Sequence, residues 1–451
     1  MPTPSDRPDV LVLGGGVAGL AAALRLAEAG RSVRLLEATG RLGGIVRTVC
    51  RDGFEAEVGP DNFLTRKPGA VRLAERLGVE TRPPHGGAMI QRNGRLHPLP
   101  AGLSGLVPGQ AGPLLTTPAI PLAARLRAVA EPLVPPRRDD ADESLEAFAV
   151  RRFGRGAWEG LIEPLLGGLY GAEREISLRA TLPHLHERER EGGLLRWRSS
   201  GPTAAAGPAF ARPVGGMERL VDALADALHE RGVAIETESP VVATEADGDG
   251  YRARLGDGTD RSARALLVAL PAPAAARVLR PLDTDLADPL AAIPMGDAAA
   301  AFVGFRTADA DVPDVSGWLV PSAEGGRVQA VTLHSRKHLG TAPDGHDLVR
   351  VFLRPSMVDA ADDDMISAAV DHLRQRIGLR GTPVFSLAHR WRGASPRYTM
   401  GHLDRVAALD AATARHPRLA LAGAALRGIG LPDVIAGAEA AADQILDSLD
   451  P

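Results

Sequence analysis

The segment that decides the fold is VLVLGGGVAGLAAALRLAEAGRSVRLLEATGRLGGIVRT, residues 10–48. Its first four residues form an apolar run typical of a buried parallel strand, and Gly14, Gly16 and Gly19 follow in the pattern G-x-G-x-x-G. Glycines at this spacing allow a tight turn and let backbone N–H groups approach a pyrophosphate, whose charge the dipole of the next helix stabilises. The segment therefore predicts a dinucleotide-binding site.

The residues after the glycines support this prediction. Residues 17–29 carry apolar side chains at helical spacing and are followed by Gly30, a helix stop signal, and residues 31–37 return to a strand. The result is one βαβ unit with a right-handed crossover. Glu37 ends the second strand, where a carboxylate can accept hydrogen bonds from a ribose diol. Because an acid would repel a 2′-phosphate, the pattern indicates NAD or FAD.

A second glycine pair distinguishes between these two cofactors. Gly43 and Gly44 follow Arg41, and we expect the chain to bend back here so that the guanidinium reaches the cofactor phosphates. An NAD enzyme has no need of such a pair, so FAD is favoured. The whole run resembles the two-dinucleotide-binding flavoprotein superfamily, which includes amine oxidases, phytoene desaturases, porphyrinogen oxidases and the GDP-dissociation inhibitors.

Three further stretches resemble the protoporphyrinogen and coproporphyrinogen oxidases, of the soluble type found in Gram-positive bacteria. They are FEAEVGPDNFLTRKPG (residues 54–69), FGRGAWEGLIEPLLGGLYGAEREISLRATLP (153–183) and LAGAALRGIGLPDVIAGAEAAADQI (421–445). Together the matches span nearly the whole chain. The third stretch also has a physical reading, because a helix beginning near Pro432 can direct its N-terminus at the isoalloxazine and stabilise negative charge there.

The resemblance implies an α/β fold of the p-hydroxybenzoate-hydroxylase or amine-oxidase type. We expect a Rossmann-like FAD domain from residues 1–87, 211–298 and 385–451, and a mixed-sheet substrate domain from residues 88–98 and 299–384. An α-helical domain takes residues 99–210. The substrate pocket is expected between the domains, where clefts usually form.

FAD is the cofactor that the resemblance implies. Contacts to it are expected at Gly14, Gly15, Gly16, Val17, Ala18, Gly19, Glu37, Ala38, Arg41, Gly43, Gly44, Gly59, Pro60, Asp61, Asn62, Val242, Trp391, Gly423, Ile429, Gly430 and Leu431. At Ile45 the family often has a basic residue instead. Trp391 has a second reading as an ordinary core aromatic.

Porphyrinogen oxidation is the chemistry that the resemblance implies. Hydride leaves a meso carbon for flavin N5 and a proton leaves a pyrrole nitrogen, three times over, so the cofactor performs the hard step. We therefore expect no catalytic side chain. The sequence shows no Ser/His/Asp arrangement and no metal motif, and its 12 histidines are scattered. No metal is expected.

Substrate propionates require cationic partners. Lys67 is the first candidate and Arg66 the second, and either could instead be an ordinary surface charge. Asn62, Phe63, Leu166 and Tyr170 are candidates for the pocket walls.

The substrate that the resemblance favours is coproporphyrinogen III. We expect its oxidation to coproporphyrin III in heme biosynthesis, with molecular oxygen as the acceptor and H2O2 as by-product. Protoporphyrinogen IX is the alternative. Whether the product passes directly to a ferrochelatase stays open. The rival classes are another FAD amine oxidase or desaturase and a non-enzymatic module like the GDP-dissociation inhibitors. The intact glycine loop and Glu37 argue against the last of these.

The composition of the chain limits which other partners and which location we expect. The chain has 451 residues, 45% of them hydrophobic, and a formal charge of -4 from 52 basic and 56 acidic residues, so nucleic acid is not expected. Cys50 is the only cysteine, which excludes an internal disulfide and fits a reducing compartment. No window approaches the roughly 20 apolar residues of a spanning helix. We expect a cytoplasmic protein.

Local patterns predict the remaining elements. Asn93-Gly94 indicates a hairpin. Residues 101–136 predict short helices and turns, which are expected to cap the pocket or, as the alternative, to contact the inner face of the membrane peripherally. The charged runs at 135–148 and 184–191 are expected to be solvated. The composition of residues 199–216 predicts a linker, and residues 233–271 predict a β-meander.

Overall fold

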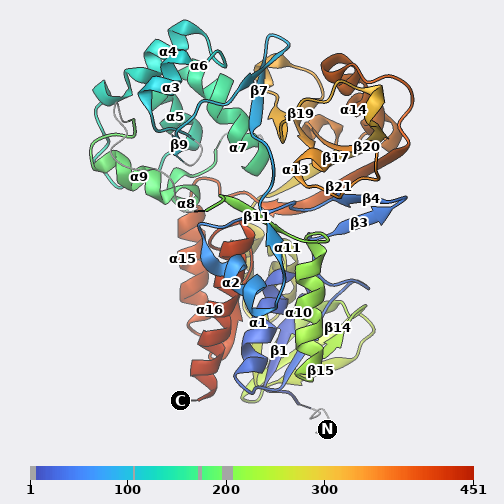
Figure 1. Cartoon of the computed structure of the whole chain (residues 1–451). Helices are drawn as coiled ribbons and strands as arrows, with labels where there is room; N and C mark the ends of the chain where they lie inside the picture. Colours follow the sequence, from blue (N-terminus) through green and yellow to red (C-terminus); the bar gives the residue numbers. More distant parts are fainter. Residues whose placement is uncertain (1–6, 105–106, 171–174, 196–206, 451) are drawn as a thin grey trace.

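A computed structural model describes residues 7–104, 107–170, 175–195 and 207–450. Figure 1 shows a parallel sheet with its helices in the lower half, a large second sheet at the upper right and a group of helices at the upper left. In these described ranges, no helix has the length and apolar character that crossing a membrane requires.

The lower half is built on a five-stranded parallel sheet, as the glycine motif predicts. In spatial order its strands are β12 (Ala234–Glu236), β2 (Val33–Leu36), β1 (Val10–Leu13), β16 (Ala265–Val268) and β22 (Leu419–Leu421). Both faces are covered, so the strands are apolar throughout rather than alternating. Val10 and Val12 of β1 pack in one core, whereas Leu11 and Leu13 pack in another on the opposite face.

Helices cover the first face of this sheet. They are α1 (Val17–Glu28), α2 (Pro68–Arg76), α10 (Glu218–Glu230) and α16 (Leu431–Leu449). The opposite face packs against a three-stranded antiparallel sheet and three helices, which are β13 (Val241–Asp247), β14 (Gly250–Leu255), β15 (Asp260–Ala263), α11 (Ala272–Leu279), α12 (Thr284–Ala291) and α15 (His402–Thr413). The predicted meander is therefore correct for β13 to β15, but the strands before and after it join the parallel sheet.

The upper right is a seven-stranded sheet. In spatial order its strands are β21 (Phe385–Pro396), β17 (Met295–Arg306), β20 (His346–Leu353), β19 (Val328–Leu333), β18 (Gly317–Leu319), β7 (Ala88–Arg92) and β8 (Arg95–Pro98). Helix α14 (Asp362–Ile377) covers one face. Strands β3 (Thr48–Arg51) and β4 (Phe54–Glu57) form a hairpin, and β4 packs on the other face. The hairpin predicted at Asn93-Gly94 is confirmed, with φ of 49° and 72° as a type I′ turn requires.

The upper left holds most of the short helices, as predicted for residues 101–136 and beyond. They are α3 (Ala111–Thr116), α4 (Leu122–Val129), α5 (Leu145–Phe153), α6 (Arg155–Ala157), the π-helical turn Trp158–Ile162, α7 (Glu163–Tyr170), α8 (Leu178–Thr181) and α9 (Pro183–Arg190), with the strand pair β9 (Leu103–Ser104) and β10 (Val107–Pro108). The linker predicted at residues 199–216 lies mostly outside the described residues.

The prediction that the charged runs are solvated is wrong in part. Helix α9 buries Glu189, which is 1% exposed and accepts hydrogen bonds from Arg151 and Arg152. The fully buried Glu131 also pairs with Arg152. A buried charge persists because it is paired and hydrogen-bonded, and a run of charged letters does not reveal partners that lie 21 to 38 residues away.

Small elements join the three regions. They are β5 (Phe63–Leu64), β11 (Phe210–Pro213) and β6 (Thr81–Arg82), which form one sheet in that order, and the single-turn helix α13 (His334–Lys337). Short 3-10 turns lie at Glu131–Leu133, Thr307–Asp309, Ser322–Glu324 and Pro355–Met357.

Candidate functional site

The glycine loop lies between β1 and α1, at the carboxyl end of the central strand. Gly14 has φ of +105°, and a Cβ on Gly19 would lie 1.8 Å from the carbonyl oxygen of Gly14. Both positions therefore require glycine. Gly16 is the N-cap of α1 with no side-chain hydrogen bond, and a Cβ there would meet nothing within 4 Å. The uncapped helix N-terminus thus faces open space, which fits the pyrophosphate of a dinucleotide.

Glu37 lies at the end of β2, next to this loop. Its Oε2 accepts the Gly15 N–H at 2.7 Å, and its Oε1 accepts the Thr39 N–H at 2.9 Å and hydroxyl at 2.8 Å. These bonds fix the carboxylate beside the glycines. Since a carboxylate has about four acceptor positions, about one remains for a ribose hydroxyl. Val242 of β13 is 46% exposed and lies three residues beyond Ser239, whose N–H donates to the Glu37 carbonyl at 2.8 Å.

The second glycine pair lies against the first loop, as the sequence suggested. The Gly43 N–H donates to the Gly15 carbonyl at 2.8 Å, and a Cβ on Gly44 would lie 3.3 Å from the Gly16 Cα. Arg41 donates to the carbonyls of Leu42 and Val46, at 2.7 and 3.0 Å. Its guanidinium therefore fastens the turn, and contact with the cofactor phosphates stays a prediction.

The segment Gly59-Pro60-Asp61-Asn62 follows β4, and side chains of the seven-stranded sheet hold it in place. The buried guanidinium of Arg350 donates to the Gly59 carbonyl at 2.7 Å and to the Val58 carbonyl at 3.2 Å. Trp391 donates its indole N–H to the same Val58 carbonyl at 3.0 Å. A Cβ on Gly59 would lie 1.9 Å from the Ile45 carbonyl oxygen. The segment is thus fixed between the two sheets.

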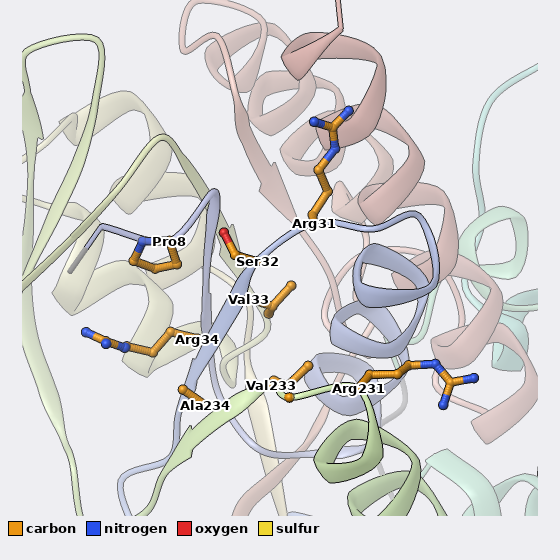
Figure 2. A pocket seen from close by; sticks show the side chains of 9 residues that line it. Pro8, Arg31, Ser32, Val33, Arg34, Arg231, Val233 and Ala234 are labelled. Carbon is orange, nitrogen blue, oxygen red and sulfur yellow. The ribbon is translucent and has the colours of Figure 1, made fainter. Parts of the chain in front are cut away.

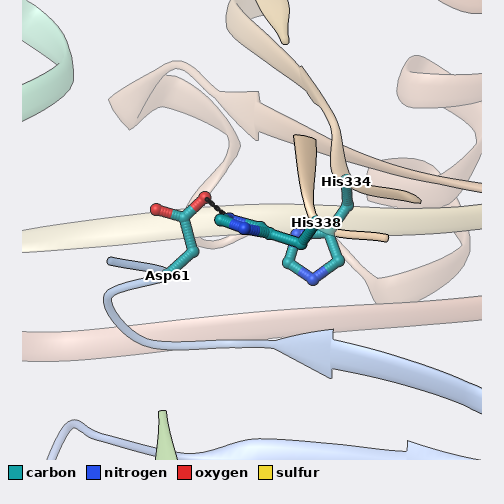
Figure 3. A group of neighbouring side chains, drawn as sticks. All are labelled: Asp61, His334 and His338. Atoms are coloured by element: carbon teal, nitrogen blue, oxygen red, sulfur yellow. Dashed lines mark hydrogen bonds and ion pairs between the residues drawn. The ribbon is translucent and has the colours of Figure 1, made fainter. Parts of the chain in front are cut away.

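Asp61 is the centre of a cluster that the sequence did not reveal (Figure 3). Its Oδ2 pairs with Lys337 Nζ at 2.7 Å and lies 3.4 Å from His338 Nε2. His334 packs edge-on against His338, with ring centroids 5.2 Å apart. Burial alone would raise the pKa of Asp61, but Lys337, His338 and Arg350 hold it well below its usual value.

The same cluster corrects the expectation that the histidines are scattered. Asp61, His334 and His338 are grouped closely enough for their donor atoms to hold a metal ion. The ammonium of Lys337 already occupies Asp61 Oδ2, however, and a divalent cation would meet this like charge. We therefore assign no metal to these residues.

The C-terminal segment brings a second helix N-terminus to the same end of the parallel sheet. Gly423 follows β22 with φ of +119°, and Gly430 is the N-cap of α16 without a side-chain cap. Tyr398 fixes the loop between them, because its hydroxyl donates to the Ala424 carbonyl at 2.6 Å. His402 Nε2 lies 2.9 Å from the Leu426 carbonyl. The loop that contains Ile429 is therefore anchored at two points.

The predicted substrate residues are more dispersed. Lys67 is half-exposed and pairs with Asp433 of α16, at 2.6 and 2.8 Å, and Arg66 is exposed. Phe63 is 3% exposed and packs in the core of the parallel sheet, whereas Leu166 packs in the helical core. Asn62 is partly exposed. The side chain of Tyr170 lies outside the described part of the structure.

A separate hollow lies away from these residues. It has a volume of about 60 Å³ and is lined by Arg31, Arg34, Arg231 and their neighbours (Figure 2). It adjoins the amino ends of β2 and β12, whereas ligands of open α/β sheets bind at the carboxyl ends. It is also too small for a dinucleotide, so it is not the cofactor site.

Three features are typical of the two-dinucleotide-binding flavoproteins: the glycine loop, Glu37 and the second helix N-terminus. The model of the family described as flavin containing amine oxidoreductase matches residues 17–446. The chain therefore belongs to the flavin containing amine oxidoreductase family, as an FAD-dependent oxidoreductase of the porphyrinogen-oxidase branch.

Relatives in this branch are similar over nearly their full length. A coproporphyrinogen III oxidase of Propionibacterium freudenreichii subsp. freudenreichii is 35% identical, covering 97% of this chain and 91% of the relative. One of Bacillus subtilis (strain 168) is 29% identical, covering 98% of each. The crystal structure of a protein from Exiguobacterium sp. 255-15, provisionally named a protoporphyrinogen oxidase, superposes with a TM-score of 0.86 at 29% identity over 100% of both chains.

Proposed function

We propose that this protein oxidises coproporphyrinogen III to coproporphyrin III in heme biosynthesis, with dioxygen as the electron acceptor. The observation that carries the proposal is the nearly full-length similarity to coproporphyrinogen III oxidases, together with the glycine loop and Glu37 geometry. The reaction removes six electrons in three steps. FAD held at this site would supply the hydride acceptor, and dioxygen would take up the electrons as H2O2.

The chain's own residues bind and orient the reactants. Backbone N–H groups at Gly14 to Gly19 and the N-terminus of α1 hold the pyrophosphate, and Glu37 holds the ribose. Arg66 and Lys67 bind substrate propionates, for which Lys67 exchanges Asp433 for a propionate. Ordered positioning of the meso carbon against the flavin is the protein's main contribution.

We propose the domain division that the sequence suggested, with one adjustment. The FAD domain comprises residues 1–87, 211–294 and 397–451, and the substrate domain comprises residues 88–98 and 295–396, so that β17 and β21 lie in one domain. The adjustment follows from β21, which pairs with β17 in the seven-stranded sheet. The helical domain takes residues 99–210, and the substrate binds between the three.

We propose a cytoplasmic location and, as a second reading, peripheral contact with the membrane. The observation behind the second reading is that Leu122, Leu126 and Leu133 are 58%, 57% and 84% exposed. Co-sedimentation with anionic vesicles tests it, because Leu126→Asp should abolish binding that depends on this patch. Hand-over of the product to a ferrochelatase is a further part of the proposal.

Protoporphyrinogen IX is the alternative substrate, favoured by the name that the Exiguobacterium relative carries. It has two propionates, whereas coproporphyrinogen III has four. The test is to follow porphyrin fluorescence in air with each substrate in parallel. Preference for coproporphyrinogen III supports the proposal, and preference for protoporphyrinogen IX supports the alternative.

A further inference from the structure

The proposed reaction releases a proton as well as a hydride. At each step the meso C–H bond breaks and its electron pair leaves with the hydrogen to the flavin. A pyrrole N–H bond also breaks, and its electron pair stays on nitrogen to form a C=N bond. Over the three steps one further meso C–H proton shifts to a nitrogen, because the porphyrin product keeps two of the four N–H groups. A proton is therefore left at the substrate, and general bases that accept such protons contribute typically about 10² to 10⁴-fold to a rate.

One titratable cluster in the described ranges lies in the segment expected to meet the flavin. Asp61 follows Gly59 and Pro60, and its side chain is 16% exposed, so a small part of it stays accessible. The side chain of His338 is 3% exposed, and Figure 3 shows its ring beside the Asp61 carboxylate. Asp61 is thus the more accessible member of the pair, and the imidazole is almost completely buried.

We propose that the Asp61–His338 pair receives the pyrrole proton, with Asp61 meeting the substrate and His338 holding the proton. The inference rests on the proposed function, since it assigns the proton of that reaction. Asp61 alone cannot hold a proton well, because Lys337 stabilises its charged form at 2.7 Å. Proton passage from Asp61 to the neutral imidazole restores the Lys337–Asp61 ion pair.

The geometry fits a neutral His338 that can accept a proton. Its Nε2 lies 3.4 Å from Asp61 Oδ2, whereas a charge-assisted bond would be about 2.7 to 2.9 Å long. Protonation would create such a bond. Burial lowers the pKa of His338 below 6.5, and Asp61 partly opposes this effect. The imidazole is therefore neutral at pH 7 and available as a base.

Other charged groups around the pair favour rapid release of the proton. Lys337 from α13, Arg350 from β20 and Arg212 from β11 act on the cluster. His334 packs against His338, and neither of its ring nitrogens has a hydrogen-bond partner in the described structure. Because dioxygen reduction to H2O2 consumes one proton for each hydride received, the proton held by His338 can be used in the second half of each cycle.

The test is the rate constant for flavin reduction, measured anaerobically by stopped-flow absorbance between pH 5 and 9 with coproporphyrinogen III. In the unmodified holoenzyme the rate constant should be flat at and above pH 6.5 and fall only at lower pH, where His338, whose pKa is lowered by burial, becomes protonated beforehand. An acid limb with its midpoint above pH 6.5, or no acid limb down to the lowest pH at which the holoenzyme keeps its FAD, would overturn the proposal without any variant.

His338→Gln should keep the contact with Asp61 while removing the base. We expect about a 10²-fold lower rate constant at pH 8 and loss of the acid limb, with FAD content and the visible spectrum unchanged. His372→Gln is the matched control, because His372 is also a largely buried histidine but contacts Trp318 and Arg376 rather than the cluster. Asp61→Asn should reproduce the effect of His338→Gln.

Two failures are distinguishable. If the unmodified protein oxidises neither porphyrinogen, the proposed function fails. If it oxidises coproporphyrinogen III but His338→Gln keeps both the wild-type rate constant and its acid limb, only the proton assignment is wrong.

Discussion

The substitution Gly16→Val separates cofactor binding from folding. Gly16 has φ of -71° and ψ of 173°, values that any residue adopts, and a Cβ at this position meets nothing within 4 Å. The apoprotein should therefore tolerate valine with a change in unfolding free energy below about 0.5 kcal/mol. The side chain would project into the space at the N-terminus of α1 that we assign to the pyrophosphate.

The loss of cofactor affinity follows from the hydrogen bonds that valine prevents. Each backbone N–H bond to a charged phosphate contributes about 1.5 to 3 kcal/mol. If the pyrophosphate loses two of them, FAD affinity should fall by about 3 to 6 kcal/mol, or roughly 10² to 10⁴-fold. The purified variant should be colourless but folded.

The assay is FAD titration of the apoprotein, followed by quenching of flavin fluorescence, with thermal unfolding of the apoprotein in parallel. Gly437→Val is a matched control, since a Cβ at this exposed position of α16 also meets nothing within 4 Å. Gly16→Val protein that binds FAD with wild-type affinity would refute the placement of the pyrophosphate. A large fall in apoprotein melting temperature would refute the claim that the position is sterically open.

Three further predictions concern other parts of the molecule. Gly19→Ala should destabilise the apoprotein by about 1 to 3 kcal/mol, measured by urea unfolding, because its Cβ would lie 1.8 Å from the Gly14 carbonyl oxygen; unchanged stability would contradict the loop geometry. Lys67→Ala should raise the porphyrinogen KM several-fold with FAD retained, since one exposed ion pair contributes up to about 1 kcal/mol, and Lys67→Arg should preserve KM; lost flavin with unchanged KM would count against the assignment. Burial, and then Arg376, lowers the pKa of His372 to about 4, so the unfolded state binds more protons between pH 6.5 and 4, and stability present above pH 6.5 is lost on acidification. Urea unfolding of His372→Asn should show a smaller loss between pH 7 and 4.5 than the wild type, by up to about 3 kcal/mol, and an equal loss would show that His372 does not titrate in this way.

Local signals in the sequence predicted the elements that form the cofactor site. The glycine spacing predicted β1, α1 and β2 because its main causes are local: Gly14 has a positive φ, and a Cβ on Gly19 would collide with the Gly14 carbonyl oxygen. The start of α16 was also predicted, as a helix that begins near Pro432.

Long-range partners were not visible in the same way. Lys337 lies 276 residues from Asp61, and His338 is read from sequence as one of several isolated histidines. The residues of β21 do not reveal to which sheet the strand belongs, because that is decided by its pairing with β17. Such contacts are set by the tertiary fold, so only the three-dimensional arrangement shows that Asp61 lies beside Lys337 and His338.

The central claim is that this FAD enzyme oxidises coproporphyrinogen III. The most direct measurement is to purify the protein, record its visible spectrum and follow porphyrin fluorescence in air with coproporphyrinogen III and protoporphyrinogen IX. We expect a yellow protein that forms coproporphyrin III and H2O2, with a higher kcat/KM for coproporphyrinogen III than for protoporphyrinogen IX. A yellow protein inert toward both substrates would contradict the proposed activity, and a colourless protein that cannot be reconstituted with FAD would contradict the cofactor site itself.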